Sequence, residues 1–237
     1  GGSAVCERHD FVAFAPIGGQ ELQPGDDLTR WFAPLGEITA RLHLHARQWT
    51  PPPGFTRKRW DVETILGPNP HWGHWRQAQG LDPQGEALLA RATDRLAATL
   101  IAYGTGPETF GLIHADLRLA NLMVDGDRLT AIDFDDCGFG WWAYDLAAAL
   151  SFYETDPRLP DLIAAWVQGY SRIAPLAAED RAMIPALIFL RRVLLTAWLS
   201  TRADSDTAQG FGGPAYTQGT LVLADRYLTD GLSAFLP

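Results

Sequence analysis

The stretch IHADLRLANLMVDGDRLTAIDFDD, residues 113–136, decides the fold. Within it, two short apolar runs at 122–124 and 129–132 flank an Asp-Gly-Asp turn at 125–127. β-Prone residues on both sides of an Asp-Gly turn are typical of a β-hairpin. The sequence therefore predicts a small hairpin with polar residues at the open end of its two strands.

The polar residues next to this hairpin are candidates for a functional site. His114, Asp116 and Asn121 come just before the first strand, and Asp133 and Asp135 come just after the second. The hairpin would bring Asp116 and Asn121 together with the two later carboxylates at one end of a rigid scaffold. Carboxylates this close repel one another and usually need a cation between them. Hard oxygen ligands of this kind suit Mg²⁺ or Mn²⁺ rather than zinc.

The order of these residues resembles the catalytic centre of the kinase-like phosphotransferases. A His-x-Asp-x-x-x-x-Asn pattern at 114–121 is followed by a hydrophobic strand ending in Asp133. The triplet at 133–135 reads Asp-Phe-Asp rather than Asp-Phe-Gly, and the loop reads His-Ala-Asp rather than His-Arg-Asp. These variants resemble the family of aminoglycoside phosphotransferases, choline kinases and type II homoserine kinases. The resemblance implies an α+β, predominantly helical fold, the C-terminal lobe of a protein-kinase-like fold with small β-hairpins.

The resemblance also implies a role for each residue of the candidate site. Asp116 would be the catalytic base, and Asn121 and Asp133 would bind the nucleotide cofactor through Mg²⁺. Asp135 is a candidate additional metal ligand. His114 and Asp145 would give structural support to the loop, although Asp145 could equally be an ordinary acid in the first turn of a helix. The implied cofactors are ATP and Mg²⁺, and the implied acceptor is a hydroxyl of a small molecule, with a protein serine or threonine left open.

The composition argues against some classes of partner and favours one cellular location. Of 237 residues, 47% are hydrophobic and 20% are charged, as in an ordinary globular protein. The net charge of −9 argues against a nucleic-acid partner, because such proteins carry a basic surface. Two cysteines make no disulfide framework, which favours a cytoplasmic location. With no signal peptide pattern and no apolar run of about 18 residues, we expect no membrane partner.

Patterns along the chain predict helices separated by irregular segments. Apolar residues recur at helical spacing in five segments, and a further helix is expected to begin within 138–147. The five segments are 26–46, 81–103, 160–174, 179–201 and 215–235. Prolines exclude long helices from 47–80, an irregular insertion expected on the substrate side, in which 57–59 (Arg-Lys-Arg) is interpreted as a solvated basic turn. Residues 202–214 are expected to form a mobile surface loop.

The start of the chain suggests an incomplete kinase. Val5 and 11–15 have strand patterns, so residues 1–23 are interpreted as a remnant of N-lobe strands and hinge, and 24–237 as the kinase-like C-lobe. The only lysine, Lys58, follows the hinge, so the nucleotide-clamping N-lobe is expected to be largely absent, or supplied by a separate N-lobe or partner chain. Two alternatives stay open. One is a catalytically silent binding module or fragment, and the other is a phosphohydrolase with an Asp nucleophile at 133.

Some polar residues fall on apolar helix patterns. Arg191 and Arg192 stand in the middle of one such pattern. An unpaired buried guanidinium is costly, so one of the two is predicted to pair with a buried acid. His43 and His45 are expected to pack or to face solvent.

Overall fold

The predicted hairpin is present and belongs to a three-stranded antiparallel sheet. The computed structural model describes residues 16–233 and 235. In it, β4 (Leu122–Asp125) pairs with β5 (Arg128–Ala131), and β1 (Gln20–Glu21) pairs with the other edge of β4. The hairpin prediction is therefore confirmed. The strands expected at Val5 and within 11–15 lie outside the described residues.

A second three-stranded sheet was not foreseen in the sequence. Its order is β2-β6-β3, with β2 (Lys58–Trp60) parallel to β6 (Gly138–Trp141) and β3 (Phe110–Ile113) antiparallel to β6. One prediction is therefore wrong. The basic stretch 57–59 is not a turn, because Lys58 and Arg59 belong to β2. The helix expected to begin within 138–147 is present as α4 (Tyr144–Ala149), which follows the strand β6. Both strands depend on hydrogen bonds to partners far away in sequence, which a local pattern does not reveal.

The five helices predicted from apolar spacing are confirmed. They are α1 (Leu28–Gln48), α3 (Pro83–Tyr103), α5 (Leu159–Ile173), α6 (Ala178–Thr201) and α8 (Gly213–Asp230). The side chain of Asp27 caps α1, and that of Asp82 caps α3 by accepting the N–H of Gly85 at 2.7 Å. The helix α3 ends at Gly104, as predicted. A 3₁₀ turn, η3 (Gly231–Ser233), follows α8.

Short helices occupy the irregular segments. The segment 47–80 has no long helix, as predicted, and contains α2 (Val62–Leu66) and η1 (Trp75–Gln77) besides β2. A further turn, η2 (Leu119–Asn121), leads into β4. The expected loop at 202–214 contains α7 (Asp206–Phe211), so that prediction is wrong over these residues. Ser205 caps α7 by accepting the N–H of Ala208 at 3.2 Å.

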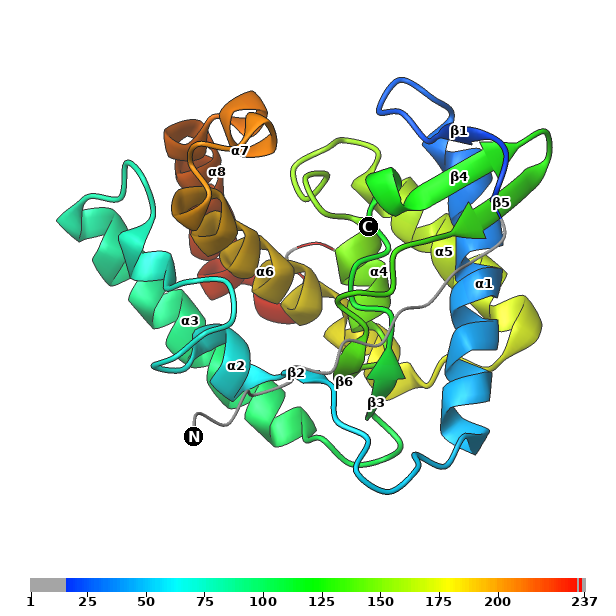
Figure 1. Cartoon of the computed structure of the whole chain (residues 1–237). Coiled ribbons are helices and arrows are strands. Elements are labelled where there is room, and N and C mark those ends of the chain that lie inside the picture. Colours follow the sequence, from blue (N-terminus) through cyan, green and yellow to red (C-terminus); the bar gives the residue numbers. More distant parts are fainter. Residues whose placement is uncertain (1–15, 234, 236–237) are drawn as a thin grey trace, which may run out of the picture.

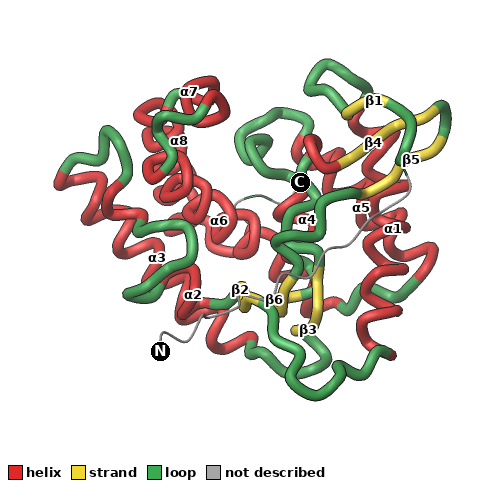
Figure 2. Tube along the Cα trace, in the orientation of Figure 1, coloured by secondary structure: helices red, strands yellow, loops and turns green. Residues whose placement is uncertain are grey.

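Two groups of helices enclose the small sheets. Figure 1 shows α1 beside α5 on one side of the molecule and α3, α6 and α8 on the other, with α4 and β6 between them. Figure 2 shows how little of the trace is strand. The helices α1 and α5 approach closely at Gly36 and Gly169, where a Cβ on Gly169 would lie 1.8 Å from the Ala33 carbonyl oxygen. Glycine is therefore required at this crossing.

The helix α6 forms the centre of the core. Its length and apolar composition would allow it to cross a membrane, but 89% of its apolar window is buried inside the fold. It packs on α4, α8 and η1. We conclude that α6 is a core helix, and that its two buried arginines, Arg191 and Arg192, must find partners within the protein.

Candidate active site

The loop between β3 and β4 carries the first half of the candidate site. Ala115 in this loop has a φ of 67°, in the left-handed region that residues with a side chain rarely adopt. Asp145 at the start of α4 is fully buried and accepts the backbone N–H of Ala115 at 2.6 Å and of His114 at 3.2 Å. The Nε2 atom of His43, on α1, lies 3.0 Å from the same carboxylate. Together α1 and α4 hold the loop in a conformation it would otherwise leave.

Asp116 follows directly, and both of its carboxylate oxygens have partners. Oδ1 accepts a hydrogen bond from Arg191 at 2.5 Å. Oδ2 accepts one from the amide of Asn121 at 2.8 Å and one from Arg118 at 3.3 Å. Burial alone would raise the pKa of Asp116, but the positive charges of Arg191 and Arg118 outweigh it and hold that pKa below its ordinary value. The carboxylate is therefore ionised at neutral pH.

His114 and Asn121 connect this loop to the hairpin. The Nε2 atom of His114 donates to the carbonyl oxygen of Ile132 at 3.1 Å, and its Nδ1 atom accepts the N–H of Asp116 at 3.3 Å. The amide nitrogen of Asn121 also donates to the carbonyl oxygen of Asp116 at 2.8 Å. Because that nitrogen is committed to Asp116, the amide oxygen of Asn121 is the atom left to bind a cation.

The segment after β5 carries the second half of the site. Asp133 has a φ of 63°, a further left-handed residue, and its Oδ1 atom accepts the N–H of Asp135 at 3.2 Å. Both carboxylates are exposed to solvent. Left-handed backbone at a residue other than glycine is often found where function requires a particular side-chain direction. The two carboxylates thus stand at the end of the hairpin, as the sequence predicts.

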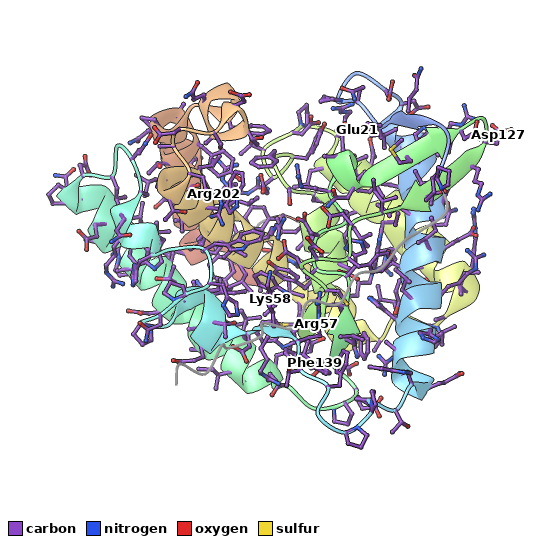
Figure 3. The ribbon with its side chains drawn as sticks, viewed as in Figure 1. Glu21, Arg57, Lys58, Asp127, Phe139 and Arg202 are labelled. Carbon is purple, nitrogen blue, oxygen red and sulfur yellow. The ribbon has the colours of Figure 1, made fainter. Side chains whose placement is uncertain are left out.

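Basic residues at the start of β2 hold this carboxylate segment in place. Arg57 donates to three backbone carbonyls, those of Phe134 at 2.8 Å, Asp135 at 2.9 Å and Cys137 at 2.6 Å. Lys58 forms an ion pair with Asp136 at 2.5 Å. Figure 3 shows Arg57 and Lys58 next to each other between the two groups of helices. Arg57 and Lys58 therefore anchor the segment from Asp133 to Cys137, a role that the sequence did not indicate.

The two halves meet at a cavity of about 350 Å³. Apart from Thr207, its lining consists of three kinds of side chain. The carboxylates are Asp116, Asp133, Asp135 and Asp136, the cations are Lys58, Arg118, Arg191 and Arg202, and the large apolar groups are Trp72, Phe152, Leu195 and Trp198. Of the tryptophans in 47–80, Trp60 and Trp75 are buried packing residues, whereas Trp72 reaches this cavity. The cavity lining thus combines charged side chains of the loop between β3 and β4 and of the segment after β5 with aromatic side chains such as Trp72 and Trp198.

The oxygen donors of this site fit Mg²⁺ only in part. Among residues 16–233 and 235, no three His, Cys, Asp or Glu side chains gather closely enough to hold a metal ion. Asn121, Asp133 and Asp135 nevertheless offer only oxygen atoms, the donor type that Mg²⁺ prefers. Mg²⁺ commonly takes one or two carboxylates and completes its shell with water and substrate phosphates. The donor set therefore fits a metal that arrives with a nucleotide, rather than a resident ion.

The sequence did not reveal two supporting residues of the site, His43 and Arg57, and it left a third, Arg191, without a named partner. His43 has the ordinary appearance of a residue on a helix, and nothing in its neighbourhood points to Asp145. Arg57 carried no local signal for its three carbonyl partners. The arginines of α6 did carry one, because a guanidinium in an apolar pattern needs an acid. Both are paired, Arg191 with Asp116 and Arg192 with Glu154 at 3.0 Å.

Known proteins resemble this chain in sequence and in fold. Residues 4–182 match the model of the phosphotransferase enzyme family, APH. A solved structure described as the microcompartment-associated aminopropanol kinase superposes with a TM-score of 0.84 at 46% identity, covering 92% of this chain and 69% of that one. Amicoumacin kinase of Bacillus subtilis (strain 168) is 25% identical over 199 residues, which are 80% of this chain and 56% of that protein.

A third relative is a homoserine kinase of Methylobacterium radiotolerans, 36% identical over 161 residues, which are 65% of this chain and 46% of that enzyme. The chain thus spans about half the length of these two curated relatives. The fold is the C-terminal lobe of a kinase-like phosphotransferase, as the sequence predicts. Since the family model matches well over half of its residues, the chain belongs to the phosphotransferase enzyme family, APH.

Proposed function

We propose that the protein transfers the γ-phosphoryl group of ATP to a hydroxyl of a small molecule, with Asp116 as the base. The observation that carries the proposal is an ionised, nine-tenths buried carboxylate on the wall of a small cavity that also contains Asp133 and Asp135. Family membership supports ATP as the phosphoryl donor. It also argues against Asp133 as the nucleophile of a phosphohydrolase.

The chemistry assigned to Asp116 follows from its environment. The carboxylate accepts a hydrogen bond from the acceptor hydroxyl and so directs the hydroxyl oxygen at the γ-phosphorus. As the new P–O bond forms and the bond to the ADP oxygen breaks, the hydroxyl proton passes to Asp116. Because a low pKa makes Asp116 a weak base, orientation contributes more than early proton removal.

Asn121 and Asp133 are the residues proposed to hold Mg²⁺, with Asp135 as an additional ligand. Bound there, Mg²⁺ would offset the negative charge of the phosphate groups. His114 and Asp145 are proposed to keep the loop rigid, since both bond its backbone. The domain division at residue 23, the need for a separate N-lobe and a cytoplasmic location stay predictions.

The size and lining of the cavity favour a small acceptor. A volume of about 350 Å³ is at the lower end of the range for ligand pockets. An amino alcohol is the first candidate, because the solved structure with 46% identity is described as an aminopropanol kinase. The carboxylates of Asp133 and Asp135 on the cavity wall can accept hydrogen bonds from an ammonium group.

Calorimetric titration of Mg·ATP, followed by assays with aminopropanol, ethanolamine, choline and homoserine, tests the proposal. Asp133→Asn should weaken Mg·ATP binding, whereas Asp116→Asn should leave it intact and lower turnover by about 10²- to 10⁴-fold. Asp127→Asn, at the turn of the same hairpin and far from Arg202 and Lys58 in Figure 3, is the control and should change neither. Failure of Mg·ATP to bind a cooperatively folded protein would favour the silent binding module instead.

A further inference from the structure

Arg191 of α6 makes more contacts than an ion pair requires. Its guanidinium is 1% exposed, and all three of its nitrogens donate hydrogen bonds. Nε donates to the Ser151 hydroxyl at 2.9 Å, Nη1 to the carbonyl oxygen of Ala115 at 3.3 Å, and Nη2 to Oδ1 of Asp116 at 2.5 Å. Ser151 in turn donates to the carbonyl of Ala148 at the end of α4. The position of Arg191 is therefore determined by α4 and α6 together.

We propose that Arg191 is a positioning residue, which orients the carboxylate of Asp116 so that Oδ2 is offered to the acceptor hydroxyl. The inference rests on the proposed function. Arg191 occupies Oδ1 and, by holding the carbonyl of Ala115, fixes the strained peptide directly before Asp116. It thereby restrains both the backbone and the side chain of the base.

The partners of Oδ2 differ in how easily they are exchanged. Asn121 is buried and reaches Oδ2 at 2.8 Å. The side chain of Arg118 is 37% exposed, lines the cavity and reaches Oδ2 at the longer distance of 3.3 Å. A hydroxyl entering the cavity can replace Arg118 without disturbing the other two contacts. The carboxylate would then have one open acceptor position, whose direction Arg191 and Asn121 define.

The neighbouring Arg192 shows what a purely structural arginine looks like on the same helix. It is also buried, and it donates to Glu154 at 3.0 Å, to the Thr220 hydroxyl at 2.8 Å and to the carbonyl oxygen of Tyr216 at 2.8 Å. None of these groups lines the cavity. Arg191 by contrast also lies over the Trp72 ring, 5.1 Å from its centroid, on the cavity wall. The two arginines are thus alike in burial and in donating hydrogen bonds from all three of their nitrogens, but only Arg191 contacts the cavity.

Arg191→Lys is the first test, because lysine keeps the positive charge and loses the planar fork that reaches three acceptors. We expect kcat for aminopropanol, or for whichever tested acceptor is phosphorylated, to fall about 100-fold, because a displacement of about 1 Å of a catalytic group has an effect of that size. The affinity for Mg·ATP should change less than about two-fold. Arg192→Lys should change kcat far less, whatever it does to the melting temperature. A loss of kcat as large in Arg192→Lys as in Arg191→Lys would overturn the proposal.

A double-mutant cycle shows whether Arg191 acts through Asp116. If it does, Arg191→Lys should cause no further loss of kcat in a protein that already carries Asp116→Asn. Fully additive losses would mean that Arg191 supports activity by another route, and the proposal would be wrong. Arg192→Lys combined with Asp116→Asn provides the additive reference.

A spectroscopic measurement separates failure of this inference from failure of the proposed function. The Nε–H signals of buried arginines in ¹⁵N spectra can be assigned with the two lysine variants. Asp116→Asn should shift the Arg191 signal and leave that of Arg192 in place. If no acceptor is phosphorylated but the Arg191 signal responds, the proposed function fails while the contact that restrains Asp116 stands. An unchanged Arg191 signal would refute the inference whatever the activity.

Discussion

Replacing Asp145 with asparagine removes one acceptor and one charge from a side chain that is 0% exposed and holds three N–H groups. If the asparagine oxygen stays at the Oδ2 position, it still accepts from His114 and His43. The amide NH₂ then takes the Oδ1 position and faces the N–H of Ala115, which lies 2.6 Å from that oxygen in the unaltered protein. At least one buried donor is therefore left without a partner.

The loss of stability can be estimated from that single unpaired donor. A buried donor without a partner costs about 1–3 kcal/mol. For a chain of this size, a loss of about 2 kcal/mol lowers the melting temperature by roughly 4–8 °C. The strained peptide at Ala115 would relax and move Asp116, and a displacement of about 1 Å costs on the order of 100-fold in kcat. Mg·ATP affinity should change little, because the hydrogen bonds of Asp145 go to His43, His114 and Ala115 and not to the segment from Asp133 to Asp136.

Thermal unfolding followed by circular dichroism, and steady-state kinetics with whichever of the tested acceptors is phosphorylated, measure the two effects. Asp161→Asn is the matched control, since Asp161 is an exposed acid in the first turn of α5. It should cost only the helix-dipole contribution, about 0.3–1 kcal/mol, and leave kcat unchanged. If Asp145→Asn behaved like Asp161→Asn, Asp145 would be an ordinary helix-start acid and the loop argument would be refuted.

Other parts of the structure give further predictions. Burial raises the pKa of Asp180, so the ionised carboxylate destabilises the folded state at pH 7. Asp180→Asn should therefore raise the melting temperature at pH 7. The gain should vanish as the pH falls to the ordinary pKa of 3.8, where the carboxyl group of the unaltered protein is protonated in the folded state. Arg57→Ala should weaken Mg·ATP binding about 10-fold or more in calorimetry, as expected when residues supporting a metal site are lost, whereas Arg59→Ala should not. Gly169→Ala should cost roughly 1–3 kcal/mol or more in denaturant unfolding because its Cβ would overlap the backbone of α1, while Gly210→Ala, with open space around it, should be tolerated.

The parts of the fold that depend on local sequence could be predicted. Apolar spacing and caps such as Asp82 and Gly104 lie next to the helices they delimit, and the Asp-Gly turn lies inside its own hairpin. The strands β2 and β6 could not be predicted in the same way. Lys58 and Arg59 look solvated and Gly138 looks flexible, and their strand conformation comes from pairing across about eighty positions. Ser205 does carry the N-cap signal of α7, but the glycines at 210, 212 and 213 disfavour a helix in the same segment.

The candidate site likewise has a part that local sequence reveals and a part that depends on tertiary packing. Asp116, Asn121 and Asp133 occur in a short motif, so the sequence could place them together. Their supports are spread over the chain, and each approaches the motif only through tertiary packing. The apolar pattern around Arg191 and Arg192 indicated that a buried arginine there needs an acid as its partner. The sequence alone could not identify Asp116 as the partner of Arg191.

The contact between His43 and Asp145 has a consequence for the order of folding. The two residues are 102 positions apart, and Arg191 stands 75 positions after Asp116. Contacts between residues so far apart in sequence form slowly, because the chain loses the entropy of loop closure before these contacts can stabilise it. During synthesis the motif at 113–136 would leave the ribosome well before α6 could reach it. Nascent chains stalled before residue 191 could thus contain every residue of the motif and still lack its active geometry.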